Sequence, residues 1–231
     1  MSALAHRSTR DEQMDAEDLD PATYAALIAD LAKVNRVTFS YRPTLRFLAR
    51  ALPAGASFRL LDVGFGHGDM LRAIAGWAAR TGRSARLTGI DLNPRSESVA
   101  RAATPPHLPI DYRTGDYAGM TGEGYDLIVS SLVAHHMRED QLVAFLRFME
   151  AEARLAWLVN DLHRHALAHA GYPLLARAMR WHRIVREDGR LSIARGFRPA
   201  EWRALLTAAG IGDYARVVRR FPFRLCVERT R

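Results

Sequence analysis

The sequence predicts an α/β fold built around a doubly wound sheet of seven strands, mostly parallel and with an antiparallel C-terminal edge strand. From Phe58 onward, short apolar runs alternate with segments in which apolar residues recur at helical spacing. This alternation is typical of a parallel sheet covered by helices on both faces. Near the C-terminus, two apolar runs lie on either side of Pro222 with no helix between them, which favours an antiparallel pair.

Two helices are expected before the sheet. Residues 1–18 are polar and of mixed charge, and we expect them to form a mobile tail. Asp20 and Pro21 are typical of a helix N-cap and a first helical residue, and a second helix is expected to begin at Pro43. We interpret residues 19–57 as a helical lid on the domain that follows.

The α/β domain, expected over residues 58–231, begins with strands and helices in alternation. The expected strands are 58–63, 86–91, 110–113, 125–130 and 154–159, and the expected helices are 69–80, 94–103 and 138–152.

After about residue 160 this rhythm breaks, and we expect a lid insertion at about 162–195. One or two helices are expected over 162–183, and residues 187–190 (Glu-Asp-Gly-Arg) are typical of a hairpin turn. Pro199 is expected to begin a helix that ends at Gly210. Residues 215–218 and 223–227 complete the sheet as an antiparallel pair.

The net positive charge of the chain is compatible with nucleic-acid binding, but the distribution of its arginines argues against that function. The chain has 33 Lys and Arg against 25 Asp and Glu, a formal charge of +8. Its only lysine is Lys33, and the arginines are scattered instead of forming a basic run. The longest uncharged stretch, residues 165–176, is shorter than the roughly 18 residues of a membrane span. With one cysteine, Cys226, and no apolar N-terminal signal, we expect a cytoplasmic protein.

The stretch LLDVGFGHGDM is the part of the sequence that most clearly indicates a ligand-binding site. It is an apolar strand ending in Asp62, followed by Gly64, Gly66 and Gly68 at a strand-to-helix turn. Glycines in such a turn let a ligand approach the backbone. A second strand ends in Asp91, where an acid can accept hydrogen bonds from a ribose. Asp69 stands where a dinucleotide fingerprint needs a small residue, and with Asp62 it favours a cationic nucleoside ligand over a diphosphate.

These motifs, in this order, resemble those of class I S-adenosylmethionine-dependent methyltransferases with a Rossmann-like fold. The resemblance covers roughly residues 58–140 and implies S-adenosylmethionine as the cofactor. It implies that Asp62 lies near the ammonium group, Asp91 at the ribose and Asp116 beside the adenine, although Asp116 also suits a turn cap. The segment YDLIVSSLVAHHM matches the fourth strand of the family and the loop after it. The full set of residues expected at the cofactor is Asp62, Gly64, Gly66, Gly68, Asp91, Leu92, Asp116, Tyr117 and Ser130.

Within the family, the chain resembles the small-molecule type, which includes ubiquinone and menaquinone methyltransferases. The usual Leu-Lys-Pro-Gly-Gly turn is replaced by MEAEARLAW, and the ending LVNDLHRH resembles methyltransferases of phenolic-lipid and polyketide pathways. With the aromatic residues of both lid segments, this favours a small hydrophobic or phenolic acceptor methylated on oxygen. Methylation of a quinone carbon, methylation of RNA or protein, and a cofactor-binding regulatory module without activity stay open as alternatives. A homodimer is also left open.

A phenol with a pKa of about 10 needs a base at neutral pH. The candidate bases are His135 and His136, after the fourth strand, and His163, after the fifth. The paired histidines recur in the family with unrelated acceptors, which favours a structural or cofactor-lining role. His163 follows Asn160 and Asp161, either of which could orient its ring. A metal site from Asp161, His163 and His165 is conceivable, but no spacing requires it, and we predict none.

Overall fold

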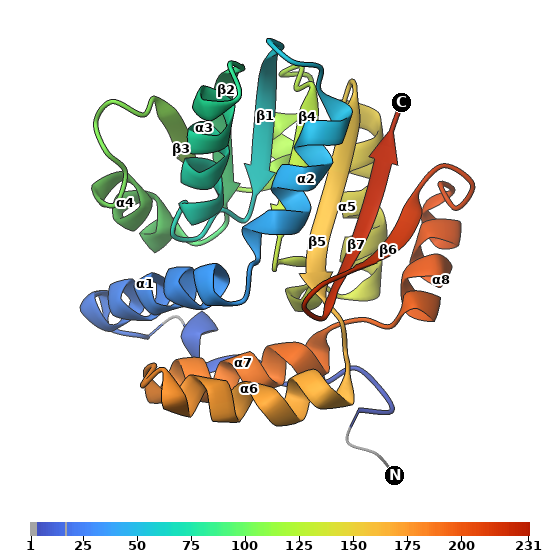
Figure 1. The fold of residues 1–231 in the computed structure, drawn as a ribbon. Coiled ribbons are helices and arrows are strands. Elements are labelled where there is room, and N and C mark those ends of the chain that lie inside the picture. The colour runs from blue at the N-terminus through green and yellow to red at the C-terminus, as the bar shows by residue number, and fades with distance from the viewer. Residues whose placement is uncertain (1–3, 17) are drawn as a thin grey trace.

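The fold is a seven-stranded sheet with helices on both faces and along one edge. It is described here from a computed structural model, for residues 4–16 and 18–231. The strand order is β3-β2-β1-β4-β5-β7-β6, which Figure 1 shows from one face. Five strands are parallel: β1 (Ser57–Val63), β2 (Ser84–Asp91), β3 (Ile110–Thr114), β4 (Leu127–Ser131) and β5 (Ala156–Leu162). The predicted fold class is confirmed.

The last two strands extend the sheet beyond β5. Strand β7 (Arg224–Thr230) pairs antiparallel with both β5 and β6 (Arg216–Arg220). The antiparallel C-terminal strand therefore lies one place inside the edge, and β6 forms the edge itself. Because β7 runs against β5, it brings Arg224 beside Leu162, at the carboxyl end of the parallel strands.

Apolar side chains fix the helices on the two faces of the sheet. One face is covered by α2 (Tyr41–Ala51), α3 (Asp69–Arg80) and α4 (Pro94–Ala102), which pack on residues such as Leu60 and Leu87. The other is covered by α5 (Glu139–Glu152) and α8 (Pro199–Ala209), which pack around Trp157 and Phe197. The caps predicted at Asp20 and Gly210 are confirmed: Asp20 accepts from the Thr23 amide at 2.9 Å, and Gly210 has φ +79°.

A third layer lies along the carboxyl ends of the parallel strands. It consists of α1 (Pro21–Val37), α6 (Ala166–Ala178) and α7 (Arg183–Arg195), which Figure 1 shows side by side below the sheet. Buried side chains of Leu27, Ala176, Trp181 and Val185 hold this layer together. Short 3-10 turns, η1 (Gln13–Asp15), η2 (Tyr117–Met120) and η3 (Ala134–His136), complete the fold.

Two predicted elements need correction. The helix expected to begin at Pro43 begins at Tyr41, since Pro43 fits within the first turn. The hairpin expected at 187–190 is wrong, because these residues lie inside α7. Gly189 serves close packing instead of a turn: a Cβ there would lie 2.2 Å from the hydroxyl oxygen of Tyr172 on α6.

The N-terminal segment, predicted to be a mobile tail, differs from that expectation over the residues that the structure describes. Leu4 and Glu12 are buried. The Ser8 amide donates to the Ala194 carbonyl at 3.0 Å, and the Asp188 carboxylate of α7 accepts from the Gln13 and Met14 amides at 3.1 and 2.9 Å. The segment packs because α7 offers acceptors for its backbone, a contact that its own polar composition does not predict.

Among the described residues, none of the helices is both long enough and apolar enough to cross a lipid bilayer.

Candidate active site

The glycine loop that follows β1 has the backbone that its sequence predicts. Gly64, Gly66 and Gly68 have φ values of +78°, +51° and +76°, a region that favours glycine. A Cβ on Gly64 would lie 2.3 Å from Val133, and one on Gly68 would lie 2.4 Å from the Tyr112 hydroxyl. The loop is therefore closely packed from behind and presents its backbone to the space in front of it.

A group of three carboxylates surrounds this loop. Asp62, at the end of β1, is buried, and its Oδ1 has no hydrogen-bond partner among the described residues. Burial, together with the charges of Asp69 and Asp91, raises the pKa of Asp62 to about 8. A cationic ligand placed here would supply the charge and the hydrogen bond that Asp62 lacks.

Asp91 holds the loop in place. Its Oδ2 accepts from the Gly66 amide at 2.8 Å, and its Oδ1 accepts from the Asn93 amide at 2.9 Å. Burial raises the pKa of Asp91, although these amide hydrogen bonds act in the opposite direction.

The remaining residues expected at the cofactor fall into two groups. Leu92 is 71% exposed, next to Asp91 on the surface. Tyr117 packs against Phe145 and Phe148, while Asp116 is exposed and accepts from the Ala118 amide at 2.8 Å, as a turn cap. Ser130 is fully buried, and its hydroxyl donates to the Val63 carbonyl at 2.9 Å. The structure thus places Ser130 behind the loop, inside the sheet.

A cavity of about 380 Å³ opens between the glycine loop and the layer of α1, α6 and α7. The loop contributes Asp62, Gly64, Gly66 and Asp69 to its wall. Most of the opposite wall is apolar. It comes from Met14 of the N-terminal segment and from the two lid segments, with Ile28, Leu31, Val34, Leu167, Leu175 and Ile193. Residues of both lid segments therefore line this space, at the carboxyl edge of the parallel strands.

All three histidines singled out from the sequence line the cavity, but only two have carboxylate partners. His135 Nδ1 lies 2.7 Å from Asp161 Oδ1, and the His135 amide donates to Asp161 Oδ2 at 2.9 Å. His136 Nδ1 lies 3.1 Å from Asp15 Oδ2. Burial alone would raise the pKa of Asp161, but the His135 ring and the amide hydrogen bonds hold it below its usual value.

His163 is not oriented by Asp161, contrary to the reasoning from sequence. Both Asp161 oxygens are occupied by His135, and Oδ1 also accepts from the Leu162 amide at 2.6 Å. The ring of His163 lies against that of His165, with centroids 5.3 Å apart. Burial, followed by the positive charges of His165 and nearby arginines, lowers the pKa of His163.

The structure also adds a residue that the sequence analysis missed. Glu12 is 4% exposed, and its Oε1 lies 3.7 Å from His135 Nε2 and 4.0 Å from His136 Nε2. It comes from the N-terminal segment, where nothing in the local sequence distinguishes it from other acids.

Comparison with known proteins gives a match to one protein family. Residues 60–154 match the family model described as a methyltransferase domain. No protein with a curated description matches the sequence significantly.

Several solved structures share the fold. Magnesium protoporphyrin IX methyltransferase from Synechocystis PCC 6803, with bound S-adenosylhomocysteine, has a TM-score of 0.57 at 14% identity, covering 94% of this chain and 90% of that chain. Human N-acetylserotonin methyltransferase, in complex with S-adenosylmethionine, has a TM-score of 0.62 at 16% identity and covers 92% of this chain and 56% of that chain. The plantazolicin methyltransferase BpumL, in complex with S-adenosylhomocysteine, has a TM-score of 0.62 at 15% identity, covering 92% and 91%. At these identities the likeness concerns the fold.

Proposed function

We propose that this chain, whose residues 60–154 match a methyltransferase domain, is a class I S-adenosylmethionine-dependent methyltransferase that methylates an oxygen atom of a hydrophobic phenolic small molecule. The main support is a largely apolar cavity that contains one histidine firmly oriented by a buried carboxylate. The cofactor residues and the acceptor class are both part of the proposal.

The glycine loop and its carboxylates suit the cofactor. Asp62 has a buried oxygen without a partner among the described residues, and a cationic amino acid group in front of the loop would pair with it. Asp91 keeps Gly66 in place for the same ligand. When bound, S-adenosylmethionine supplies a methyl group on a sulfonium and leaves as a neutral thioether, so the departing group needs no acid.

The lid layer suits an apolar acceptor. Side chains such as Leu31, Leu167 and Leu175 lie across the cavity from the loop. An acceptor held between these side chains and the loop would be kept from water and aligned with the methyl group. The methyl carbon then changes its bond from sulfur to the phenolic oxygen, and the hydroxyl proton must be removed.

We assign the activation of this hydroxyl to His135. The hydrogen bond from Nδ1 to Asp161 leaves Nε2 directed at the cavity as the proton acceptor, and it stabilises the imidazolium that forms. His163 lines the same cavity without such a partner. His136 is paired with Asp15 near the surface, and we assign it a positioning role.

A matched pair of variants tests this assignment. His135→Ala is expected to lower kcat for a phenolic acceptor by about 100-fold or more, the usual contribution of a general base, while His163→Ala is expected to keep the rate within about 3-fold. Calorimetry with S-adenosylhomocysteine should give the same affinity for both variants, because neither residue belongs to the glycine loop. Near wild-type turnover by His135→Ala would contradict the assignment, and methylation of carbon in the product would contradict the acceptor chemistry.

A further inference from the structure

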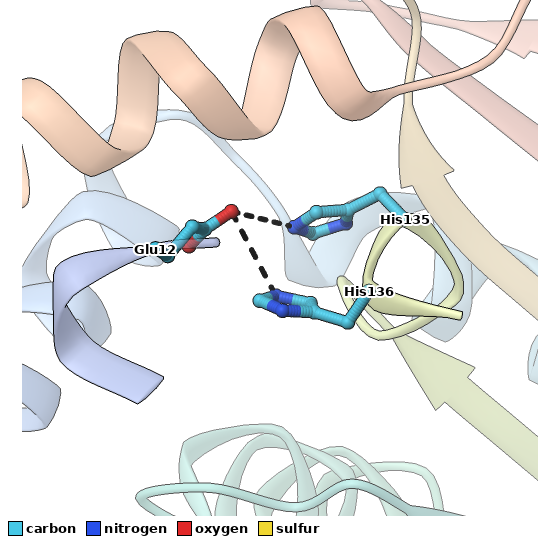
Figure 2. A group of neighbouring side chains, drawn as sticks. All are labelled: Glu12, His135 and His136. Atoms are coloured by element: carbon cyan, nitrogen blue, oxygen red, sulfur yellow. Dashed lines mark ion pairs between the residues drawn. The ribbon is translucent and has the colours of Figure 1, made fainter. Parts of the chain in front are cut away.

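Three side chains that are distant in the sequence meet at the roof of the cavity. Figure 2 shows Glu12 of the N-terminal segment directed at the rings of His135 and His136, which come from η3. One ligand atom of each residue lies within 4.8 Å of the others. The Glu12 Oε1 atom lies 3.7 Å from Nε2 of His135 and 4.0 Å from Nε2 of His136.

These distances are too long for hydrogen bonds but suit a shared ion. Neither Nε2 atom has a hydrogen-bond partner among the residues that the structure describes. An ion with ligand distances of about 2.1 Å in tetrahedral geometry would hold its ligand atoms about 3.4 Å apart. The two distances to Glu12, 3.7 and 4.0 Å, are close to this value. All three atoms lie within 4.8 Å of one another, so the two ring nitrogens would need to approach each other by at most about 1.4 Å to bind such an ion.

The other nitrogen of each ring is already fixed by a carboxylate. His135 Nδ1 lies 2.7 Å from Asp161, and His136 Nδ1 lies 3.1 Å from Asp15. Metal-binding histidines typically donate their second N–H to such a partner, which sets the tautomer and directs the free nitrogen at the ion. Both rings here have this arrangement, and both direct Nε2 at the same carboxylate oxygen.

Among the described residues, the nearby arginines form no ion pair with Glu12, Asp15 or Asp161. The Arg7 guanidinium donates to the backbone carbonyls of His135 and Met137. The Arg195 guanidinium donates to those of His135 and His136. The Glu12 Oε1 atom accepts one hydrogen bond, from the Ser192 hydroxyl at 2.7 Å, and as a carboxylate oxygen it can still bind a cation.

We propose that Glu12, His135 and His136 bind a divalent transition-metal ion through one carboxylate oxygen and two Nε2 atoms. Two imidazoles and one carboxylate suit zinc, and also iron or manganese, better than magnesium or calcium. All three residues line the cavity, so the remaining coordination position faces the acceptor.

Binding of the ion does not depend on the function proposed above, but the role of the ion in methyl transfer rests on that function. The acceptor would present its phenolic oxygen to the open position, where the ion would lower the pKa of the hydroxyl. The acceptor would then release its proton to solvent as it enters the cavity and bind as the phenolate. His135 is then a ligand, and the ion takes over the activation of the hydroxyl. The bonds formed and broken in methyl transfer are unchanged.

Titrating the full-length, chelator-treated protein with Zn²⁺ by calorimetry tests the proposal, with Co²⁺ absorption as a second readout. We expect one site per chain and visible Co²⁺ bands of low-symmetry coordination. Glu12→Gln and His136→Ala should each weaken binding at least 10-fold, and Asp15→Asn, which changes a half-exposed side chain, should weaken it about 10- to 100-fold. His169→Ala, which removes a histidine on α6 outside the group, should leave the affinity unchanged.

Absence of stoichiometric binding would overturn the proposal. So would binding that Glu12→Gln, His136→Ala and Asp15→Asn all leave intact, since the ion would then lie elsewhere. Because the titration contains neither cofactor nor acceptor, its failure is distinct from a failure of the proposed methyl transfer, which the phenolic assay measures.

Discussion

At the residue scale, the proposed contact between Asp62 and the cofactor predicts that cofactor binding depends on pH. Its pKa of about 8 means that Asp62 carries a proton at neutral pH before a ligand binds. Pairing with a cationic ligand requires the carboxylate, so binding releases a proton below that pKa. The affinity for S-adenosylmethionine is expected to fall about tenfold for each unit by which the pH drops below about 8.

Calorimetry over about pH 6 to 8 measures how steeply the affinity for S-adenosylmethionine changes with pH. Repeating it in two buffers of different ionisation enthalpy measures the number of protons released on binding. Asp62→Asn should weaken binding about 10- to 100-fold, as expected for the loss of a charged hydrogen bond, and should flatten the pH dependence. If Asp62→Asn kept the pH dependence of the affinity, a group other than Asp62 would be responsible for it.

The residues of the site differ in how far the sequence could predict them. The placements of Asp62, Asp91 and the glycines at strand ends follow from local pattern, because strand ends and glycine turns are set by neighbouring residues. Glu12 and Asp15 could not be found this way, since their partners are remote: Asp15 and His136 stand 121 positions apart. Asp161 is close to His163 in the sequence, which predicts that Asp161 orients the His163 ring. In the structure the Asp161 carboxylate binds His135 instead.

At the element scale, α7 is a helix that its sequence pattern did not predict along its whole length. Its residues 187–190 are polar and contain a glycine, as in a turn. In the structure each makes a tertiary contact. Glu187 accepts from the Gln13 side chain at 2.8 Å, and Asp188 holds the N-terminal segment. Gly189 makes room for Tyr172, and Arg190 donates to His169 of α6 at 3.2 Å. Strands and helices with strong apolar patterns, such as β1 and α3, were predicted closely because their burial is encoded in their own sequence.

Gly189→Ala is expected to destabilise the protein by about 1–3 kcal/mol, the typical cost of overpacking. The added methyl group would meet the Tyr172 ring, whose hydroxyl donates to the Val185 carbonyl at 2.9 Å. Gly171→Ala in α6 is the matched control, because nothing lies within 4 Å of its Cβ position.

Helix propensity predicts that Gly171→Ala is neutral or stabilising by up to about 1 kcal/mol. Chemical denaturation of both variants measures the difference. Equal stability of the two would show that α6 and α7 do not pack as closely as described.

At the scale of the whole molecule, the charge of +8 overstates the basic character of the surface. Arg164, Arg195 and Arg224 are buried. Arg164 pairs with Glu201 and the Gly196 carbonyl, and Arg224 donates to the hydroxyls of Thr38 and Ser40. These arginines hold segments together and are not available to phosphates.

We therefore expect no binding of single- or double-stranded RNA tighter than about 10⁻⁶ M at physiological salt, the range of non-specific association. Fluorescence anisotropy with labelled RNA over a series of salt concentrations measures it. Tight binding with a steep salt dependence would instead favour RNA as the methyl acceptor.

The packing of Leu4 and Glu12 has a practical consequence for handling this enzyme. A purification tag or reporter fused before Leu4 would pull on a segment whose Leu4 carbonyl accepts from Arg164 and whose Glu12 lines the cavity. The last strand ends at the opposite end of the sheet, because Thr230 pairs with Ala156 at the start of β5. A fusion after Arg231 would lie away from the cavity and is the better choice.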